Sequence, residues 1–256
     1  MSIQLKSKAE IEIMRHANLI VYEVLQTLKE MVVPGVTTLD LDRKAAELTR
    51  ARGAKPAFLN YPAASVDVAP FPGVICSSVN EVIVHGIPNG VPLNEGDIVS
   101  IDYGCCYEGF FGDSAVTVAV GTVSETAQKL LQVTAQSLED AIAQCQSGNR
   151  IGDVSAAVQE RVEQNGFGIV REFVGHGIGR AMHEPPHVPN YGSVGQGRLL
   201  RPGLVIAIEP MVTVGSYETR VLADGWTAVT RDGSLAAHFE HSVAITEDGP
   251  YVLSRP

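Results

Sequence analysis

The sequence repeats itself, and this internal repeat constrains the fold more than any other feature. Four patterns in the first half recur in the second half in the same order. Any single match could arise by chance, but four in one order indicate two similar structural units. The matched patterns are Gly35, Asp40 and Gly53 with Gly148, Asp153 and Gly166; Glu81-x-x-x-His85-Gly86-Ile87 with Glu172-x-x-x-His176-Gly177-Ile178; GDIVSID (96–102) with GLVIAIE (203–209); and Asp113 with Glu240.

Each half is predicted to contain helices followed by strands. Apolar residues at spacings of three and four predict the helices, and alternation predicts the strands. Thr38 is expected to cap the second helix, and the proline-rich segment 54–78 is expected to be an irregular loop over one face. The predicted helices span 8–30, 38–52, 125–146 and 151–164, and the predicted strands span 96–104, 112–120, a pair within 203–215, and 241–246.

This order predicts an α+β protein made of one catalytic domain, residues 1–256. Two halves related by an approximate two-fold axis, at about residues 34–120 and 147–248, would follow an N-terminal helix. We expect a joint central antiparallel sheet with the helices on its outer face, because each amphipathic helix must bury its apolar side.

Composition limits the classes of function. The chain has 256 residues, a formal net charge of −10 and a pI near 5.1, which argues against nucleic acid or an anionic membrane as the main partner. No stretch approaches the roughly 20 apolar residues of a membrane span, and the N-terminus lacks an apolar signal core. We expect a cytoplasmic monomer. Its four cysteines lack C-x-x-C spacing and should be free thiols.

Carboxylates stand at the ends of the apolar strands in both halves. Asp102 ends one strand and Glu209 ends its counterpart, while Asp113 and Glu240 each precede an apolar run. A carboxylate in apolar surroundings is costly unless it is paired, protonated or bound to metal. A two-fold axis would gather all four beside His176, and such a group needs cations to balance its charge.

The combination of four carboxylates and one histidine predicts a hydrolytic metal centre. Mixed oxygen and nitrogen ligands suit Mn, Fe, Co or Zn better than Ca or Mg. Carboxylates can bridge two metals about 3.5–4 Å apart, an arrangement that activates a shared water. His85 is the partner of His176 in the repeat, so it should approach the centre from the opposite half. His85 and His183 could both donate hydrogen bonds to a carbonyl oxygen or to a departing amine.

Taken together, the motifs resemble those of the bacterial-type, type I methionine aminopeptidases, which have the pita-bread (creatinase/aminopeptidase) fold. The resemblance covers nearly the whole chain. It implies a metallo-exopeptidase that removes the N-terminal methionine from nascent proteins with a small second residue, at the ribosome. The matching motifs are NEVIVHGIP (80–88), GDIVSIDYG (96–104), GDS (112–114), GHGIGRAMHEPP (175–186), IEPM (208–211) and DGWTAVTRDGSLAAHFEH (224–241).

The resemblance also implies a role for each metal-binding residue. Asp113 and Glu240 would bridge two divalent ions, which could be Co, Mn, Fe, Zn or Ni. Asp102 would chelate one ion, and His176 with Glu209 would hold the other. Glu209 would also take the proton of the attacking water.

The resemblance further implies a substrate pocket, in which His85 and His183 would contact the substrate and the tetrahedral intermediate. Tyr61 and Trp226 match the usual pocket residues. Three positions depart from the commonest pattern, and a short insertion lies between Tyr61 and Phe71. Cys76 is either a pocket residue or an ordinary buried thiol. The departing positions are Phe58, Phe71 and Met182, where cysteine, tyrosine and phenylalanine are frequent.

Two other functions are compatible with the same ligands. A prolidase or aminopeptidase P would share the fold, but these enzymes usually carry an additional N-terminal domain, and we expect none here. A non-catalytic binding protein would have lost metal ligands, whereas all five are present in this sequence.

Overall fold

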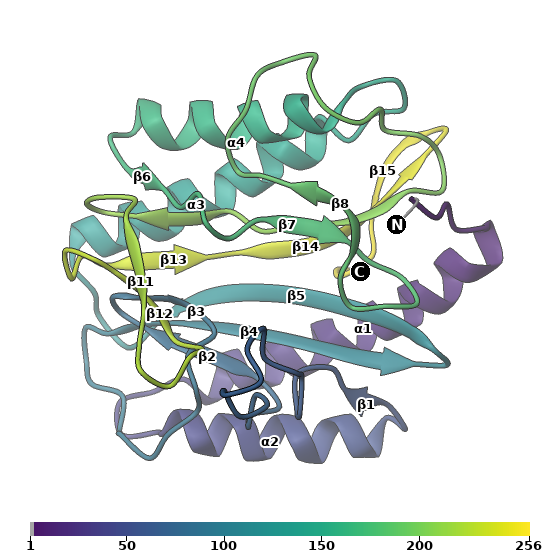
Figure 1. Ribbon diagram of the computed structural model, residues 1–256. Coiled ribbons are helices and arrows are strands. Elements are labelled where there is room, and N and C mark those ends of the chain that lie inside the picture. The colour runs from purple at the N-terminus through teal and green to yellow at the C-terminus, as the bar shows by residue number, and fades with distance from the viewer. Residues whose placement is uncertain (1–2) are drawn as a thin grey trace.

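The computed structural model describes residues 3–256, in which helices cover the outer side of a curved layer of strands (Figure 1). Helices α1 and α2 pack on one half of the strand layer, and α3 and α4 cover the other half. The predicted α+β class is therefore confirmed. The helices are α1 (Lys8–Met31), α2 (Thr38–Ala51), α3 (Glu125–Ala143) and α4 (Ile151–Gln164).

Local sequence explains where the helices begin. The Ser7 and Glu10 side chains bond each other's backbone N–H groups at the start of α1, which forms a capping box. The same arrangement joins Thr37 and Asp40 at α2, so Thr37 is the cap and the prediction of Thr38 was wrong by one residue. The Thr38 hydroxyl instead accepts the N–H of Asn89.

The strands form one large antiparallel sheet and two small ones. In the large sheet the order is β1-β4-β5-β14-β9-β7-β8, with β2 also paired to β4 and β15 to β14. The small sheets are β13-β10-β6 and β11-β12-β3. The strands are β1 (Lys55–Pro56), β2 (Cys76–Val79), β3 (Val82–Val84), β4 (Ile98–Tyr107), β5 (Phe110–Ala119), β6 (Gly168–Ile169), β7 (Gly175–Gly177), β8 (Glu184–Val188), β9 (Val205–Ile208), β10 (Met211–Thr213), β11 (Thr219–Val221), β12 (Ala228–Thr230), β13 (Ala236–His238), β14 (Glu240–Thr246) and β15 (Gly249–Val252).

The segment 54–78 is more regular than its prolines suggest. Its two ends contain β1 and most of β2, and both strands pair with β4. The predicted pair within 203–215 consists of β9 and β10, which belong to different sheets. The four cysteines are free thiols, as predicted. Within residues 3–256, none of the helices combines the length and apolar character needed to cross a membrane.

The internal repeat is visible in the backbone. The N–H of Gly35 bonds the carbonyl of Leu93 at 2.8 Å, and the N–H of Gly148 bonds that of Leu200 at 3.1 Å. Matched glycines also share the left-handed φ that disfavours other residues. Their φ values are 95° and 99° for Gly35 and Gly148, 67° and 78° for Gly53 and Gly166, and 94° and 92° for Gly96 and Gly203.

One sequence match does not correspond to a structural equivalence. His176 on β7 lies opposite Ala207 on β9, while Ser78 on β2 lies opposite Ser100 on β4. Because Ser100 and Ala207 are matched in the repeat, Ser78 takes the place equivalent to His176. His85 follows β3, which belongs to a small sheet. The prediction that His85 is the repeat partner of His176 was therefore wrong.

The core lies between the helices and the large sheet, in one apolar cluster under each helix pair. Leu28 and Ile101 belong to the cluster beneath α1 and α2. Leu130 and Ile206 belong to the cluster beneath α3 and α4. The order β4-β5-β14-β9 places two strands of the first half beside two strands of the second, so the large sheet is continuous between the two halves.

Candidate metal centre and substrate pocket

A cavity of about 160 Å³ lies beside the central strands of the large sheet. All the residues singled out from the sequence line it, so the structure brings the entire predicted set together. They are Phe58, Tyr61, Phe71, Cys76, His85, Asp102, Asp113, His176, Met182, His183, Glu209, Trp226 and Glu240.

The four carboxylates come from four adjacent strands of the large sheet. Asp102 lies on β4, Asp113 on β5 and Glu240 at the start of β14, and Glu209 directly follows β9. The strands β5 and β14 pair where Ala115 lies opposite Glu240. This pairing joins the two halves, and therefore the cluster contains residues from both.

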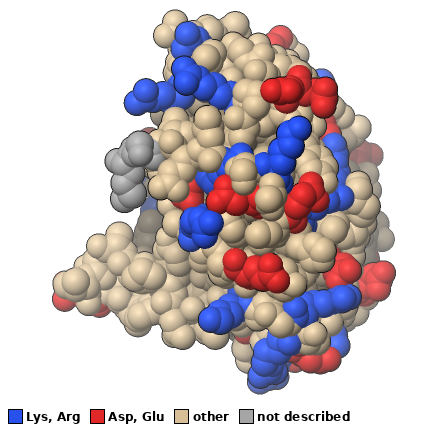
Figure 2. All heavy atoms as spheres, turned by 90° about the vertical axis from the view of Figure 1, so that its right-hand side faces the viewer, with Lys and Arg blue, Asp and Glu red and all other residues tan. Residues whose placement is uncertain are grey.

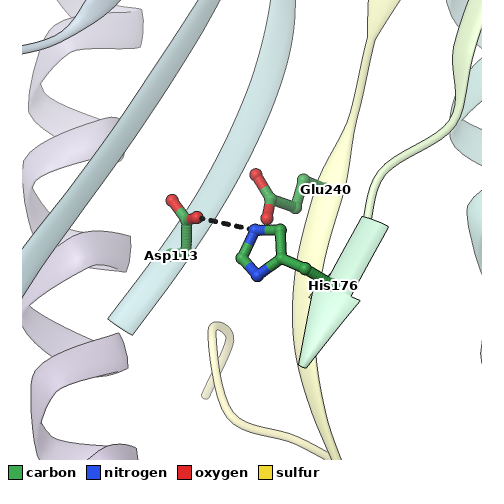
Figure 3. Close-up of side chains that lie close together, drawn as sticks. All are labelled: Asp113, His176 and Glu240. Atoms are coloured by element: carbon green, nitrogen blue, oxygen red, sulfur yellow. Dashed lines mark ion pairs between the residues drawn. The ribbon is translucent and has the colours of Figure 1, made fainter. Parts of the chain in front are cut away.

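Asp113, His176 and Glu240 form the tightest part of the cluster. Each offers one ligand atom, and these atoms all lie within 4.8 Å of one another; the side chains converge from three strands (Figure 3). The Nε2 atom of His176 is 3.8 Å from Oδ2 of Asp113 and 3.6 Å from Oε1 of Glu209. Its Nδ1 lies 2.9 Å from the Gly177 carbonyl. Nδ1–H therefore donates to this carbonyl, and Nε2 presents its lone pair to the carboxylates.

Burial and mutual repulsion dominate the electrostatics of the cluster. Burial raises the pKa of Asp102 to about 7. It also raises the pKa values of Asp113, Glu209 and Glu240 well above the ordinary range, with a further contribution from neighbouring carboxylates. Burial lowers the pKa of His176 to about 3, so this ring is neutral. A neutral imidazole among crowded carboxylates favours cations over protons at neutral pH.

The donor atoms of this cluster fit divalent metal ions. Three buried carboxylate oxygens have no hydrogen-bond partner within the described part of the chain: Asp102 Oδ1, Asp113 Oδ1 and Glu240 Oε1. Buried polar atoms normally have partners, and an ion accounts for such exceptions. Carboxylate oxygens with one imidazole nitrogen suit Mn, Fe, Co, Ni or Zn, and the set contains no thiolate that would favour a softer metal.

His85 and His183 flank the carboxylates. Burial lowers the pKa of His85 to about 4, and its backbone has a φ of 58°, which is strained for a residue with a Cβ. The Nδ1 atom of His183 lies 2.6 Å from the Tyr61 hydroxyl, and its ring centroid is 4.3 Å from that of His176. Burial also lowers the pKa of His183. Both rings are therefore neutral donors beside the cluster.

Apolar side chains form the remaining wall of the cavity. Phe71 packs edge-on against Trp226 with 5.3 Å between ring centroids, and the Trp226 indole N–H donates to the Ala69 carbonyl at 2.9 Å. Phe58 and Met182 are buried beside them in the same apolar cluster. Cys76 also faces the cavity, and burial raises the pKa of its thiol well above the ordinary value. The wall is thus apolar and closely packed.

One residue near the cluster was not singled out from the sequence. His238, at the end of β13, is 1% exposed, and its Nε2 lies 3.7 Å from Oε2 of Glu209. Burial lowers its pKa to about 3. Its position two residues before Glu240 was the available signal, because alternate residues of an extended segment share one face.

Comparisons with known proteins find metallopeptidases by sequence and by structure. Residues 12–247 match the model of metallopeptidase family M24. A methionine aminopeptidase of Clostridium perfringens is 48% identical over 98% of both chains, and methionine aminopeptidase 1 of Bacillus subtilis is 46% identical over 98% of both. The crystal structure of a methionine aminopeptidase from Thermotoga maritima has a TM-score of 0.95 and 44% identity, with both chains fully covered. The prolidase of Pyrococcus furiosus, 21% identical with a TM-score of 0.77, shares the fold; the match covers 98% of this chain and 65% of the prolidase.

Proposed function

We propose a function for this chain on the premise that it belongs to metallopeptidase family M24. Its fold is the pita-bread fold of that family. The protein is a metallo-exopeptidase that removes the N-terminal methionine from proteins, as the names of its full-length relatives indicate. The observation that carries this function is the juxtaposition of a metal-binding carboxylate cluster and a small apolar cavity.

The enzyme uses divalent metal ions, whose identity is open. Asp102, Asp113, His176, Glu209 and Glu240 would hold two of them, with Asp113 and Glu240 as the bridging pair. When bound, such ions lower the pKa of a water molecule and neutralise charge that develops on the carbonyl oxygen. Asp113 and Glu240 lie on β5 and β14, which pair where the two halves meet, and this central placement supports the bridging role.

The apolar wall would bind the methionine side chain. Phe58, Phe71, Met182 and Trp226 surround a space that suits one unbranched thioether, and aromatic rings contact sulfur favourably. The cavity of about 160 Å³ suits a single side chain of this kind. The full-length relatives that are named methionine aminopeptidase support cleavage after the first residue of the chain.

Glu209 and two histidines would carry out the proton transfers. Glu209 would take a proton from the attacking water and deliver it to the departing amine. The Tyr61 hydroxyl can donate to Nδ1 of His183, which leaves the proton on Nε2. Nε2–H of His183 would then donate to the carbonyl oxygen of the substrate, and His85 would donate to the substrate from the other side of the cluster.

The substrates would be the N-termini of nascent proteins with a small second residue. We assign the enzyme to the cytoplasm, as a monomer that acts near the ribosome without specific binding to nucleic acid. Its net charge of −10 supports the last point, because a surface that binds nucleic acid is usually basic.

The test is peptide hydrolysis by metal-stripped protein. Met-Ala-Ser and a Xaa-Pro tripeptide are each offered with Mn, Fe(II), Co, Ni or Zn added back. We expect release of methionine from Met-Ala-Ser only when metal is present. Cleavage of the Xaa-Pro peptide instead would indicate a prolidase or aminopeptidase P. Failure to cleave either peptide with any metal, in folded protein, would leave a binding role.

A further inference from the structure

The segment that precedes α1 packs against the loop that carries two cavity residues. This loop, residues 178–183, joins β7 to β8 and is called the His183 loop below. The N–H of Lys6 donates to the Gly203 carbonyl at 2.7 Å, and its ammonium lies 2.5 Å from Oε2 of Glu184. Figure 2 shows the side of the molecule that faces right in Figure 1, where acidic and basic side chains mix on the surface. The Lys6–Glu184 pair differs from surface pairs, since its side chains are only 5% and 11% exposed.

Glu184 transmits this contact to the backbone of the His183 loop. Its other oxygen, Oε1, accepts the N–H groups of Arg180 at 2.8 Å and Ala181 at 3.1 Å. A Cβ at Gly179 would collide with the Lys6 side chain, so the glycine leaves room for this approach. The Glu184 carboxylate thus connects the segment before α1 to two residues of the loop, Arg180 and Ala181.

Further contacts hold the outer side of the loop. The Arg180 guanidinium is 3.0 Å from Oε1 of Glu10 in α1 and lies 4.4 Å from the centroid of the Phe110 ring. The Gly179 carbonyl accepts the N–H of Phe111 at 2.8 Å. Of these contacts, only the Lys6–Glu184 pair is both charged and buried, and a buried charge tolerates the loss of its partner poorly.

The inner side of the same loop faces the cavity. Met182 is 4% exposed and forms part of the apolar wall. His183 reaches the Tyr61 hydroxyl at 2.6 Å. Lys6 does not line the cavity. Its ammonium contacts only the Gln4 carbonyl and Glu184 among the described residues, so we expect an effect of the ammonium on the reaction to pass through Glu184 and the loop.

We propose that Lys6 is a positioning residue for His183 and Met182 and acts through Glu184. The proposal rests on the proposed function, since it concerns the same site. Without the ammonium group, Glu184 would be a buried carboxylate with no compensating charge. It would turn toward water, and its hold on the N–H groups of Arg180 and Ala181 would weaken. The loop would then present His183 in several positions instead of one.

The test compares Lys6→Met with Lys8→Met in the full-length protein with Mn²⁺. Lys8 is the matched control, because it lies two residues away in the same region and is exposed. For Lys6→Met we expect kcat/KM for Met-Ala-Ser to fall about 10- to 100-fold, because small displacements of a reacting group are costly. The fall should appear in kcat, with Mn²⁺ affinity by calorimetry unchanged. Hydrogen exchange at residues 178–184 should accelerate.

Two further variants serve as controls. Lys6→Arg should recover most of the activity, and Lys8→Met should match the unmodified protein.

A double-mutant cycle tests whether Lys6 acts through His183. When His183 has already been replaced by alanine, Lys6→Met should lower kcat/KM only slightly further, since the side chain that Lys6 positions is gone. The same fold loss in both backgrounds would overturn the proposal, as would normal kcat/KM and normal exchange in Lys6→Met. If Lys6→Met does not fold, Glu184→Gln is tested in its place. It is expected to show the same loss of kcat/KM and faster hydrogen exchange at residues 178–184. Unchanged kcat/KM and unchanged exchange would overturn the proposal. If the unmodified protein releases no methionine with any metal, the proposed function fails. The hydrogen-exchange measurement alone then decides whether Lys6 holds the His183 loop in place.

Discussion

The Nε2 atom of His238 lies 3.7 Å from Oε2 of Glu209, and neither ring nitrogen of His238 has a hydrogen-bond partner within residues 3–256. A small rotation of either side chain would bring the two into hydrogen-bond range. Since buried polar groups normally have partners, the ring is well placed to donate to the carboxylate. It would thereby orient Glu209 both as a metal ligand and as the base that accepts a proton from water.

His238→Leu is expected to weaken metal binding, because Glu209 loses the group that orients it. Loss of such a supporting partner typically costs about 10- to 100-fold in metal affinity. His238→Gln should bind metal with nearly normal affinity, since the glutamine amide can still donate a hydrogen bond to Glu209. Calorimetric titration of stripped protein with Mn²⁺ measures both, with His16→Leu as the control at an exposed histidine stacked on Tyr107. Normal affinity in His238→Leu would contradict the assignment.

Removal of a carboxylate that is proposed to bridge the two metals should abolish turnover. In Asp113→Ala or Glu240→Ala, one metal loses a ligand and the remaining carboxylates cannot hold two ions close together. We expect methionine release to drop below detection and bound metal to fall from two ions per chain toward one, by calorimetry and elemental analysis. Asp248→Ala is the matched control, an exposed aspartate. Two bound ions and normal turnover in either bridge variant would disprove the bridging role.

His85→Ala should slow turnover without loss of metal. The ring lines the cavity but lies outside the predicted ligand set, so calorimetry should give the affinity of the unmodified protein. Loss of one hydrogen bond to the reacting carbonyl typically costs on the order of 10²–10³ in kcat. Steady-state kinetics with Met-Ala-Ser measures the loss. Equal kcat in the variant and the unmodified protein would exclude a catalytic role for His85.

Asp102 gives the metal-free protein a characteristic pH dependence. Its pKa rises from 3.8 to about 7 on folding, so between these values the folded chain binds more protons than the unfolded chain. The contribution of Asp102 to the stability of the metal-free protein therefore falls as pH rises through this window and is constant above it. Asp102→Asn removes this loss of stability. In the presence of chelator, the amount by which the Tm of the variant exceeds that of the unmodified protein should therefore grow from pH 4 to pH 7. Scanning calorimetry at several pH values measures the difference. A Tm difference that shrinks as pH rises would contradict the raised pKa of Asp102.

The metal cluster could be predicted from sequence because its residues repeat. Asp102 and Glu209 end matched apolar strands, and antiparallel pairing through β5 and β14 then brings them to one place. His238 could not be found in this way. Its place two residues before Glu240 indicates a shared face, but the contact with Glu209 is visible only in the fold. The roles of all these residues stay predictions.

The errors also have physical causes. Glu-x-x-x-His-Gly-Ile occurs twice, but a short pattern does not specify its strand, and only the register showed that Ser78 matches His176. The strand β1 holds two residues and pairs with Cys105 and Cys106, about fifty positions along the chain, so no local signal marks it. Thr37 and Thr38 are both good caps, and the choice between them depends on Asp40 and on Asn89.

The pairing of β5 with β14 determines when during synthesis the proposed centre can form. The carboxylates on β4 and β5 leave the ribosome long before Glu240, which stands near the end of the chain. Until then, the edge of β5 that Glu240 and His241 later cover has no partner strand, and Asp102 and Asp113 lack the residues that complete their centre. The proposed centre therefore cannot assemble before β14 has been made and has paired with β5.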